Sequence, residues 1–410
     1  MVAAIAALLT VALAAPPASA QLPAPPDGLP SLSDIIEQVG GIEGLQPLDP
    51  ILNPVADLII TLENLLGLNG GAGSVNTIQL AGDDAISAAI SFSQLAFPDG
   101  SSTAVIGRDD LFADAMASSG FQGVRTAPLL LTTSGDLDQR TGMELQRLEL
   151  DAITILGGES ALNPLVVQKL QIAGIEVTRV GGPTRVETAV QAAGATVPSA
   201  THAMLVRAYP GAGQSDDQAY ADLLAAGPFA ADNSWPVLMT TSDTLHPAVR
   251  EKLSGFNAVT IVGGTSAISD AVEQDLAGMG ITVDRVSGPN RFATAVAIAN
   301  ARGFESSADP DQIVLAEQAG RDDVWAPGFA STAYATIVDA PVLLSDGDSL
   351  PDETIEFLNA GVEQNLEDGG PAIICAPFVS ENACEGLDCW SPATPARGQT
   401  SLASTSPTCR

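Results

Sequence analysis

Short apolar runs alternate with amphipathic stretches of helical length along most of the chain. Residues 203–208, 236–241, 258–264 and 281–286 are short apolar runs, whereas residues 219–230, residues 246–256 and a stretch after Ser269 have the pattern of helices. Strands that alternate with helices form βαβ units, and wholly apolar strands fit a parallel sheet covered by helices on both faces. The pattern therefore predicts a doubly wound, Rossmann- or flavodoxin-like α/β fold.

This pattern occurs three times. LAGDDAISAAI begins at Leu80, VGGPTRVETAV at Val180 and VSGPNRFATAV at Val286. PLLLTTSGDL, PVLMTTSDTL and PVLLSDGDSL follow in the same order, and AITILGGESAL and AVTIVGGTSAI end the first two copies, where the third has PAIICAPFVSE. Ordered blocks that recur at nearly constant spacing indicate tandem modules. Each copy, of about 100 residues, is long enough to bury a core of its own.

The repeats divide the chain into six expected parts. Residues 1–20 have an apolar stretch and a small-residue cleavage site, Ala18-Ser19-Ala20, which favour a cleaved secretory signal; a membrane anchor is the alternative. We expect a Pro-rich leader with short helices at 21–77, modules at 78–177, 178–282 and 283–387, and a Cys-containing tail at 388–410. The third module is degenerate in its C-terminal part. No second apolar span follows, so we expect no transmembrane segment in the mature chain.

A Gly-Pro turn and an arginine open a helix in the second and third copies. One interpretation is an anion cradle, formed by the arginine and the free N–H groups of the helix start. The other is a structural turn whose arginine pairs with acidic residues of a neighbouring module. A dinucleotide loop is excluded because Gly-x-Gly-x-x-Gly is absent. The first copy has Ala85 at the arginine position, so we expect no anion site there. The residues concerned are Arg185 and Arg291, with Thr188 and Thr294 three residues further on.

Carboxylates and hydroxyls are also expected at the carboxyl edge of each sheet, where doubly wound folds place their ligands. Asp114 and Asp222 recur in the acidic block that precedes a helix, and Pro327 replaces them in the third copy. These acids either stabilise a helix start or contact a ligand. The hydroxyls that end the apolar strand either bind a polyol or cap the next turn. The strand blocks contribute Pro128, Thr132, Thr133, Pro236, Thr240, Thr241, Pro341 and Ser345.

Composition narrows the class of ligand. The chain has 49 acidic and 16 basic residues, a net charge of −33, which should repel nucleic acid and anionic membranes. No nucleophile–base set is evident, because the two histidines lie outside the repeated blocks and no Gly-x-Ser-x-Gly elbow occurs. We therefore expect no catalytic residues, no cofactor and no metal.

All four cysteines, Cys375, Cys384, Cys389 and Cys409, lie in the last 36 residues. In an exported chain an even set predicts one or two disulfides, and two bridges allow three connectivities. The spacing lacks the paired Cys-x-x-Cys knuckles of a zinc site. Disulfide bonds between the cysteines are therefore expected to restrain the C-terminal end of the chain.

The repeated blocks resemble the cell-wall-binding repeat type 2 family, which occurs as three tandem copies in exported proteins of Gram-positive bacteria. The resemblance rests on VGGPTRVETAV, AYADLLAAGP, PVLMTTSDTL and VTIVGGTSAIS, and it covers residues 78 to about 385. It implies parallel α/β modules in a pseudo-threefold arrangement. The family's Pro-Ile-Leu-Leu motif maps onto the residues from Pro128, Pro236 and Pro341, and the arginine of its Arg-x-x-Thr-Ala signature maps onto Arg185 and Arg291.

The resemblance implies a secreted, non-enzymatic surface protein that binds the cell wall without a covalent bond. Its expected partner is an anionic cell-wall polysaccharide or teichoic-acid-like polymer. Such a partner requires locally concentrated arginines or bridging cations, because the chain itself is strongly negative. Departures at Ala85, Pro327 and Cys375-Ala376-Pro377 indicate that the three modules differ in ligand binding. The alternatives are an exported wall hydrolase that uses module-edge carboxylates, and a surface interaction protein without polymer affinity.

Overall fold

The computed structural model describes residues 77–318, 320–361 and 370–385. The predicted signal, the leader and the tail with Cys389 and Cys409 lie outside these residues. Within them the chain forms three four-stranded sheets in which every strand pair is parallel. The predicted α/β modules are confirmed. None of the described helices is long and apolar enough to cross a membrane.

The first and second sheets share one topology. The first has the strand order β3-β2-β4-β5 and the second the order β7-β6-β8-β9. The strands of the first are β2 (Thr103–Arg108), β3 (Leu129–Thr132), β4 (Ala152–Leu156) and β5 (Glu176–Val180), with helices η2 (Ala115–Ala117), α5 (Ser119–Val124), α6 (Gln139–Leu148) and α7 (Pro164–Ile172). Those of the second are β6 (His202–Arg207), β7 (Val237–Thr240), β8 (Ala258–Val262) and β9 (Thr282–Val286), with η3 (Asp216–Ala219), α9 (Gly227–Asp232), α10 (Pro247–Lys252), η4 (Leu253–Gly255) and α11 (Asp270–Gly278).

The third sheet takes one strand from the start of the described chain. Its order is β1-β12-β10-β11, and in β1 Ile78 pairs with Ile374. The N–H of Leu80 continues the ladder by donating to the Cys375 carbonyl at 2.9 Å. The elements of this sheet are β1 (Thr77–Gln79), β10 (Gln312–Glu317), β11 (Val342–Ser345) and β12 (Ala372–Cys375), with helices α13 (Trp325–Ile337), α14 (Asp352–Ala360) and α16 (Glu381–Glu385).

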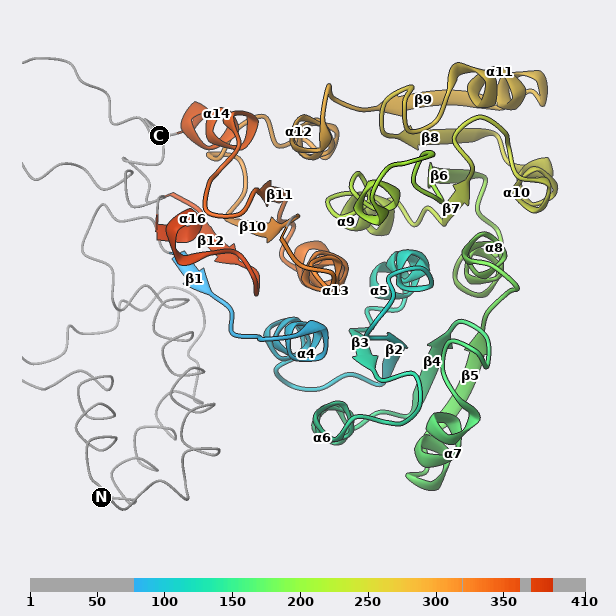
Figure 1. Ribbon diagram of the computed structural model, residues 1–410, viewed down its shortest axis with the longest axis vertical. Coiled ribbons are helices and arrows are strands. Elements are labelled where there is room, and N and C mark those ends of the chain that lie inside the picture. The colour runs from blue at the N-terminus through green and yellow to red at the C-terminus, as the bar shows by residue number, and fades with distance from the viewer. Residues whose placement is uncertain (1–76, 319, 362–369, 386–410) are drawn as a thin grey trace, which may run out of the picture. The chain divides into compact units, whose positions relative to one another are not determined.

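The helix after each edge strand crosses to the next sheet. After β1, α4 (Ala85–Ala96) packs on β3 of the first sheet; after β5, α8 (Arg185–Thr196) packs on β7; after β9, α12 (Arg291–Ala301) packs on β11. These three crossings link the sheets in a closed cycle (Figure 1). The boundaries expected at 178 and 283 fall inside β5 and β9, because each of these strands completes the sheet of the preceding copy. Residue 78, the expected start of module 1, lies in the third sheet.

Helices α5, α9 and α13 meet at the centre of the three modules (Figure 1). Small residues allow this approach: a Cβ on Gly123 would lie 2.3 Å from the Ala231 Cβ, and one on Gly227 would lie 2.2 Å from the Thr332 Oγ1. One continuous cluster of buried apolar side chains therefore extends through all three modules, and a smaller cluster lies mainly in the first. The expectation that each copy buries a separate core is corrected, since the central helices bury one another.

The helix predicted at 219–230 is interrupted. A 3₁₀ turn ends at Ala219 and α9 begins only at Gly227. Pro228 follows at the start of α9, where its missing N–H is tolerated, whereas its ring would clash inside a longer helix. The Gly-Pro pair therefore divides the predicted helix in two.

A disulfide joins Cys375 at the end of β12 to Cys384 in α16. It is one of the predicted pairings. Helix α16 also contacts β1. The bridge therefore holds α16 beside the strand that closes the cycle.

Candidate functional site

The helices α4, α8 and α12 lie at the three seams between modules. We name the seams by the modules they join: α8 lies at seam 1–2, α12 at seam 2–3 and α4 at seam 3–1. Each helix is capped by a polar side chain that accepts a backbone N–H of its first turn, and the caps are Asp84, Thr184 and Asn290. Arg185 and Arg291 follow their caps as the first helical residues. The turn therefore places each arginine at a seam.

The buried threonines of the same block stabilise the turn. The Thr188 hydroxyl accepts the N–H of Gly182 at 3.0 Å, and the Thr294 hydroxyl accepts the N–H of Gly288 at 3.1 Å. A Cβ on Gly182 would lie 2.4 Å from the Glu187 Cβ, so glycine is required where the strand turns into the helix. These turn N–H groups bond within the chain. The threonines thus lie where the anion cradle was predicted, but they bond to the turn itself.

Arg185 lies between aromatic rings of two modules. Its guanidinium carbon is 4.7 Å from the Phe112 ring centroid in module 1 and 5.0 Å from that of Tyr209 in module 2. Its Nη1 donates to the Ala208 carbonyl at 3.0 Å. Burial lowers the pKa of Arg185. Electrostatic interactions with Tyr209, Asp216 and Asp114 oppose this shift. Across the described part of the chain, no carboxylate forms an ion pair with this guanidinium.

Arg291, the equivalent residue at seam 2–3, is ion-paired. Its Nη1 lies 2.7 Å from the Asp217 Oδ2 in module 2, and it also donates to Gln318 in module 3. Burial raises the pKa of Asp222 in the same network, opposed by the Thr294 hydroxyl and by nearby arginines. This arginine therefore joins two modules through an acidic neighbour.

Seam 3–1 has an arginine from another element in place of the one lost at Ala85. The Arg321 guanidinium lies 4.0 Å from the Phe378 ring centroid, pairs with Asp323 at 2.8 Å and donates to the Asp83 carbonyl at 2.8 Å. The sequence analysis missed this residue. The repeated tripeptide Arg-Asp-Asp, at 108–110 and 321–323, could have indicated it.

The strand-end hydroxyls cap their own loops. Thr132 donates to the Asp136 carbonyl at 3.0 Å, and Thr240 donates to the Thr244 carbonyl at 2.8 Å. Thr133 and Thr241 donate to these same two carbonyls, and Ser345 donates to Glu317. The carbonyls of Pro128, Pro236 and Pro341 accept the N–H groups of Val105, Met204 and Val314. The fully buried hydroxyls of Thr132, Thr240 and Ser345 thus have structural partners, whereas Thr133 and Thr241 remain partly exposed.

The side chains of Asp114 and Asp222 lie against the glycines that follow β4 and β8, and they leave no room for a larger residue there. A Cβ on Gly157 would lie 2.4 Å from the Asp114 Oδ2, and one on Gly263 would lie 2.5 Å from the Asp222 Oδ2. The third module has Pro327 in place of the acid, and the strand register places Pro377 where the first module has Gly157. Loss of the carboxylate therefore removes the need for glycine, which explains the degenerate block of the third copy.

Asp109 and Asp110 form the acidic pair of the first module. Asp110 accepts two hydrogen bonds from Arg108, at 2.5 and 2.8 Å, and burial raises the pKa of its neighbour Asp109. No group of three or more His, Cys, Asp or Glu side chains suited to a metal ion occurs among the residues with described positions.

The sequence matches one family three times in succession. Cell wall binding domain 2 (CWB2) matches residues 79–167, 179–273 and 285–375, which together exceed half of the chain. The chain belongs to the CWB2 family. The predicted resemblance is confirmed, and membership indicates cell-wall binding and a place at the cell wall or cell surface.

The chain is similar to part of each of two Bacillus subtilis proteins. N-acetylmuramoyl-L-alanine amidase LytC of Bacillus subtilis (strain 168) is 29% identical over 208 residues, which are 50% of this chain and 39% of the relative. The amidase enhancer of the same organism is 30% identical over 210 residues, 50% of this chain and 27% of the relative. The chain thus spans well under half the length of either protein.

Two solved structures share the fold. Cwp8 from Clostridium difficile has a TM-score of 0.65 at 23% identity, covering 81% of this chain and 54% of that one. Cwp6 from the same organism has a TM-score of 0.64 at 20% identity, covering 78% and 48%. Both support the arrangement of three α/β modules described above.

Proposed function

We propose that this chain is a secreted, non-catalytic anchor whose CWB2 modules bind an anionic cell-wall polymer at seam 1–2. Family membership supports wall binding in general. The observation that carries the finer proposal is Arg185, whose guanidinium lies between two aromatic rings and has no ion pair with a carboxylate of the described residues. Its counterpart Arg291 is already neutralised by Asp217.

The surroundings of Arg185 favour an anion. The rings of Phe112 and Tyr209 restrict the guanidinium, so little side-chain entropy is lost when it binds. Arginine also recognises phosphate or carboxylate through a bidentate pair of hydrogen bonds. An anionic unit of a polymer would compensate the desolvation that lowers the pKa of this arginine. Thr133 and Thr241, at the same carboxyl edge, are proposed contacts for polymer hydroxyls.

The net charge of −33 opposes binding at long range. Salt screens this repulsion with a Debye length of about 10 Å at 0.1 M, while a partly buried contact is screened less. Binding through Arg185 should therefore persist at moderate ionic strength, and bridging cations should strengthen it.

Binding to purified cell walls tests the proposal by co-sedimentation. Arg185→Ala is expected to weaken binding roughly 10- to 100-fold, the loss typical of a hydrogen bond to a charged group. Arg185→Lys should recover only part of it, because an ammonium cannot form the planar bidentate pair.

Arg291→Ala is the matched control. It removes the equivalent arginine at seam 2–3, where Asp217 already pairs with that arginine. Its wall binding should stay within about threefold of the wild type, and thermal unfolding verifies that each variant is folded. If the Arg185→Ala variant sediments with cell walls as strongly as the wild type does, the proposed site is contradicted. No sedimentation at any salt would favour a surface interaction protein, and release of soluble wall fragments would favour a hydrolase.

A further inference from the structure

A polar cavity of about 240 Å³ opens at the amino edge of the first sheet, where its strands begin. This is the sheet edge opposite to the one where the glycine turns lie. Its polar lining is Thr103, Thr154, Thr178, Arg125 and Glu176, and Phe121 lies among the apolar residues of the wall. Allowing about 30 Å³ per water, the space suits a ligand of roughly eight non-hydrogen atoms.

The lining combines a hydroxyl with two charged side chains. Thr154 is only 7% exposed, and its hydroxyl has no hydrogen bond within the described residues. Its oxygen is accessible from the cavity rather than fully buried, so a ligand there can bond to it. Arg125 and Glu176 are both exposed at this cavity but form no ion pair with each other; Arg125 donates to the Ala195 carbonyl at 2.9 Å. The cavity thus presents one positive and one negative group.

The corresponding space in module 2 is filled by side chains. His202 and Trp235 occupy the positions of Thr103 and Ala127 and stack with ring centroids 3.9 Å apart. The His202 Nε2 lies 2.8 Å from the Oγ1 of Thr260, which is the counterpart of Thr154. The hydroxyl that is unpaired in module 1 therefore has a partner in module 2.

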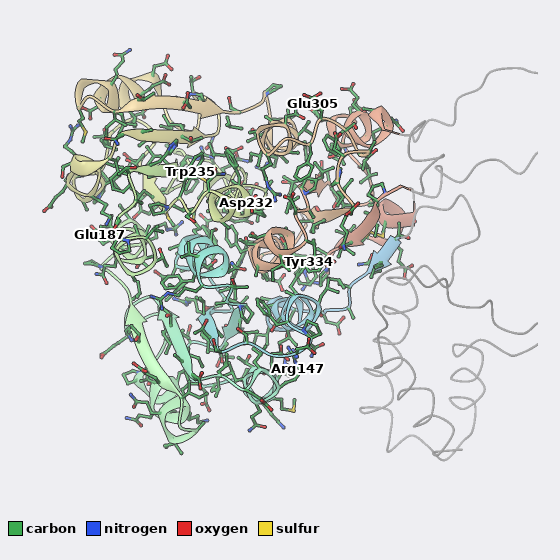
Figure 2. All side chains as sticks on the ribbon, turned by 180° about the vertical axis from the view of Figure 1, so that it is seen from behind. Arg147, Glu187, Asp232, Trp235, Glu305 and Tyr334 are labelled. Atoms are coloured by element: carbon green, nitrogen blue, oxygen red, sulfur yellow. A yellow bond between two sulfur atoms is a disulfide. The ribbon has the colours of Figure 1, made fainter. Side chains whose placement is uncertain are left out.

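Module 3 closes the space in another way. Tyr334 bonds to Gln312, the first residue of β10, and Ile374 replaces the threonine of the strand. Figure 2 shows Trp235 in module 2 and Tyr334 in module 3, where Tyr334 contacts Phe92 of α4 with ring centroids 6.4 Å apart. Within the described chain, only module 1 has small side chains and a hydroxyl without a protein partner at the amino edge of its sheet.

We propose that this cavity binds a small zwitterion of amino-acid size. Arg125 holds the carboxylate, Glu176 holds the ammonium group, and the Thr154 hydroxyl bonds to the bound molecule. The cavity residue Arg125 contacts the C-terminal end of α8, whereas Arg185 is the first residue of that helix, so this site does not depend on the proposed polymer binding.

Ligand-observed NMR titration of the full chain tests this site. Alanine is expected to bind with a dissociation constant on the order of 1 mM, since a ligand of a few atoms at an open site gains limited free energy. Propionate and ethylammonium, which each carry one charge, should bind at least about tenfold more weakly. Alanyl-alanine carries the same charges further apart, so the stronger binder reports the spacing that the site accepts.

The double variant Thr103→His and Ala127→Trp copies the module 2 stack into module 1 and should abolish binding. Arg125→Gln and Glu176→Gln should each weaken it about tenfold, and both residues are exposed, so folding is preserved. Arg185→Ala should leave alanine binding unchanged. The absence of saturable binding by either zwitterion would overturn the proposal. So would propionate binding as tightly as alanine, or full binding in both the Arg125 and Glu176 variants.

Discussion

Replacing Ile78 by Asp is expected to lower the free energy of unfolding by at least about 3 kcal/mol. Ile78 is 1% exposed in β1, the strand that completes the third sheet and leads into α4 on the first. A carboxylate at this position loses its water without gaining a partner, and β1 is expected to detach. Urea denaturation measures the loss, and faster proteolysis near residue 80 locates it.

Ile78→Val is the matched control, because it keeps the strand and removes one methylene. It should cost about 0.5–1.5 kcal/mol. An Asp variant as stable as the Val variant would show that β1 does not close the cycle between modules 3 and 1.

Replacing Gly123 by Ala is expected to lower the free energy of unfolding by about 2–3 kcal/mol, the upper part of the usual range for overpacking. The new Cβ would lie 2.3 Å from the Ala231 Cβ and 2.6 Å from the Ala231 Cα, so the backbones of α5 and α9 must separate. Because one buried cluster extends through the modules, the loss should appear in a single unfolding transition followed by circular dichroism.

Gly142→Ala is the control for this change, since it is the same substitution in α6. Its Cβ would meet only the Leu137 Cδ2, at 3.8 Å. Alanine is the better helix former, so this variant should gain about 0.5–1 kcal/mol. A stabilising effect at both glycines would contradict the close central packing.

The sequence was sufficient to predict the module pattern but not the crossing between modules. Apolar runs and the recurring blocks identify the strands, because parallel strands are buried on both faces. Strand β1 has only three residues, Thr77–Gln79, and its partner β12 lies almost 300 residues away. Local patterning contains no information on such a pairing, which depends on the closed arrangement of all three sheets.

The site was predicted in part. The glycine turn places Arg185 and Arg291 at seams, but the same motif gives them different partners. Tyr209 contacts one arginine, whereas Asp217 pairs with the other. Tyr209 lies in a loop and Asp217 in η3, and each contacts an arginine of a seam helix, so spacing alone could not show which arginine has an ion pair.

Hydrogen–deuterium exchange with purified wall polymer tests the central proposal most directly. We predict slower amide exchange on binding in residues 108–114, residues 207–213 and the start of α8, which surround Arg185. Peptides at seam 2–3 that contain Asp217 or Gln318 should not change. Slowing confined to seam 2–3, or no slowing at seam 1–2 under saturating polymer, would contradict polymer binding at Arg185.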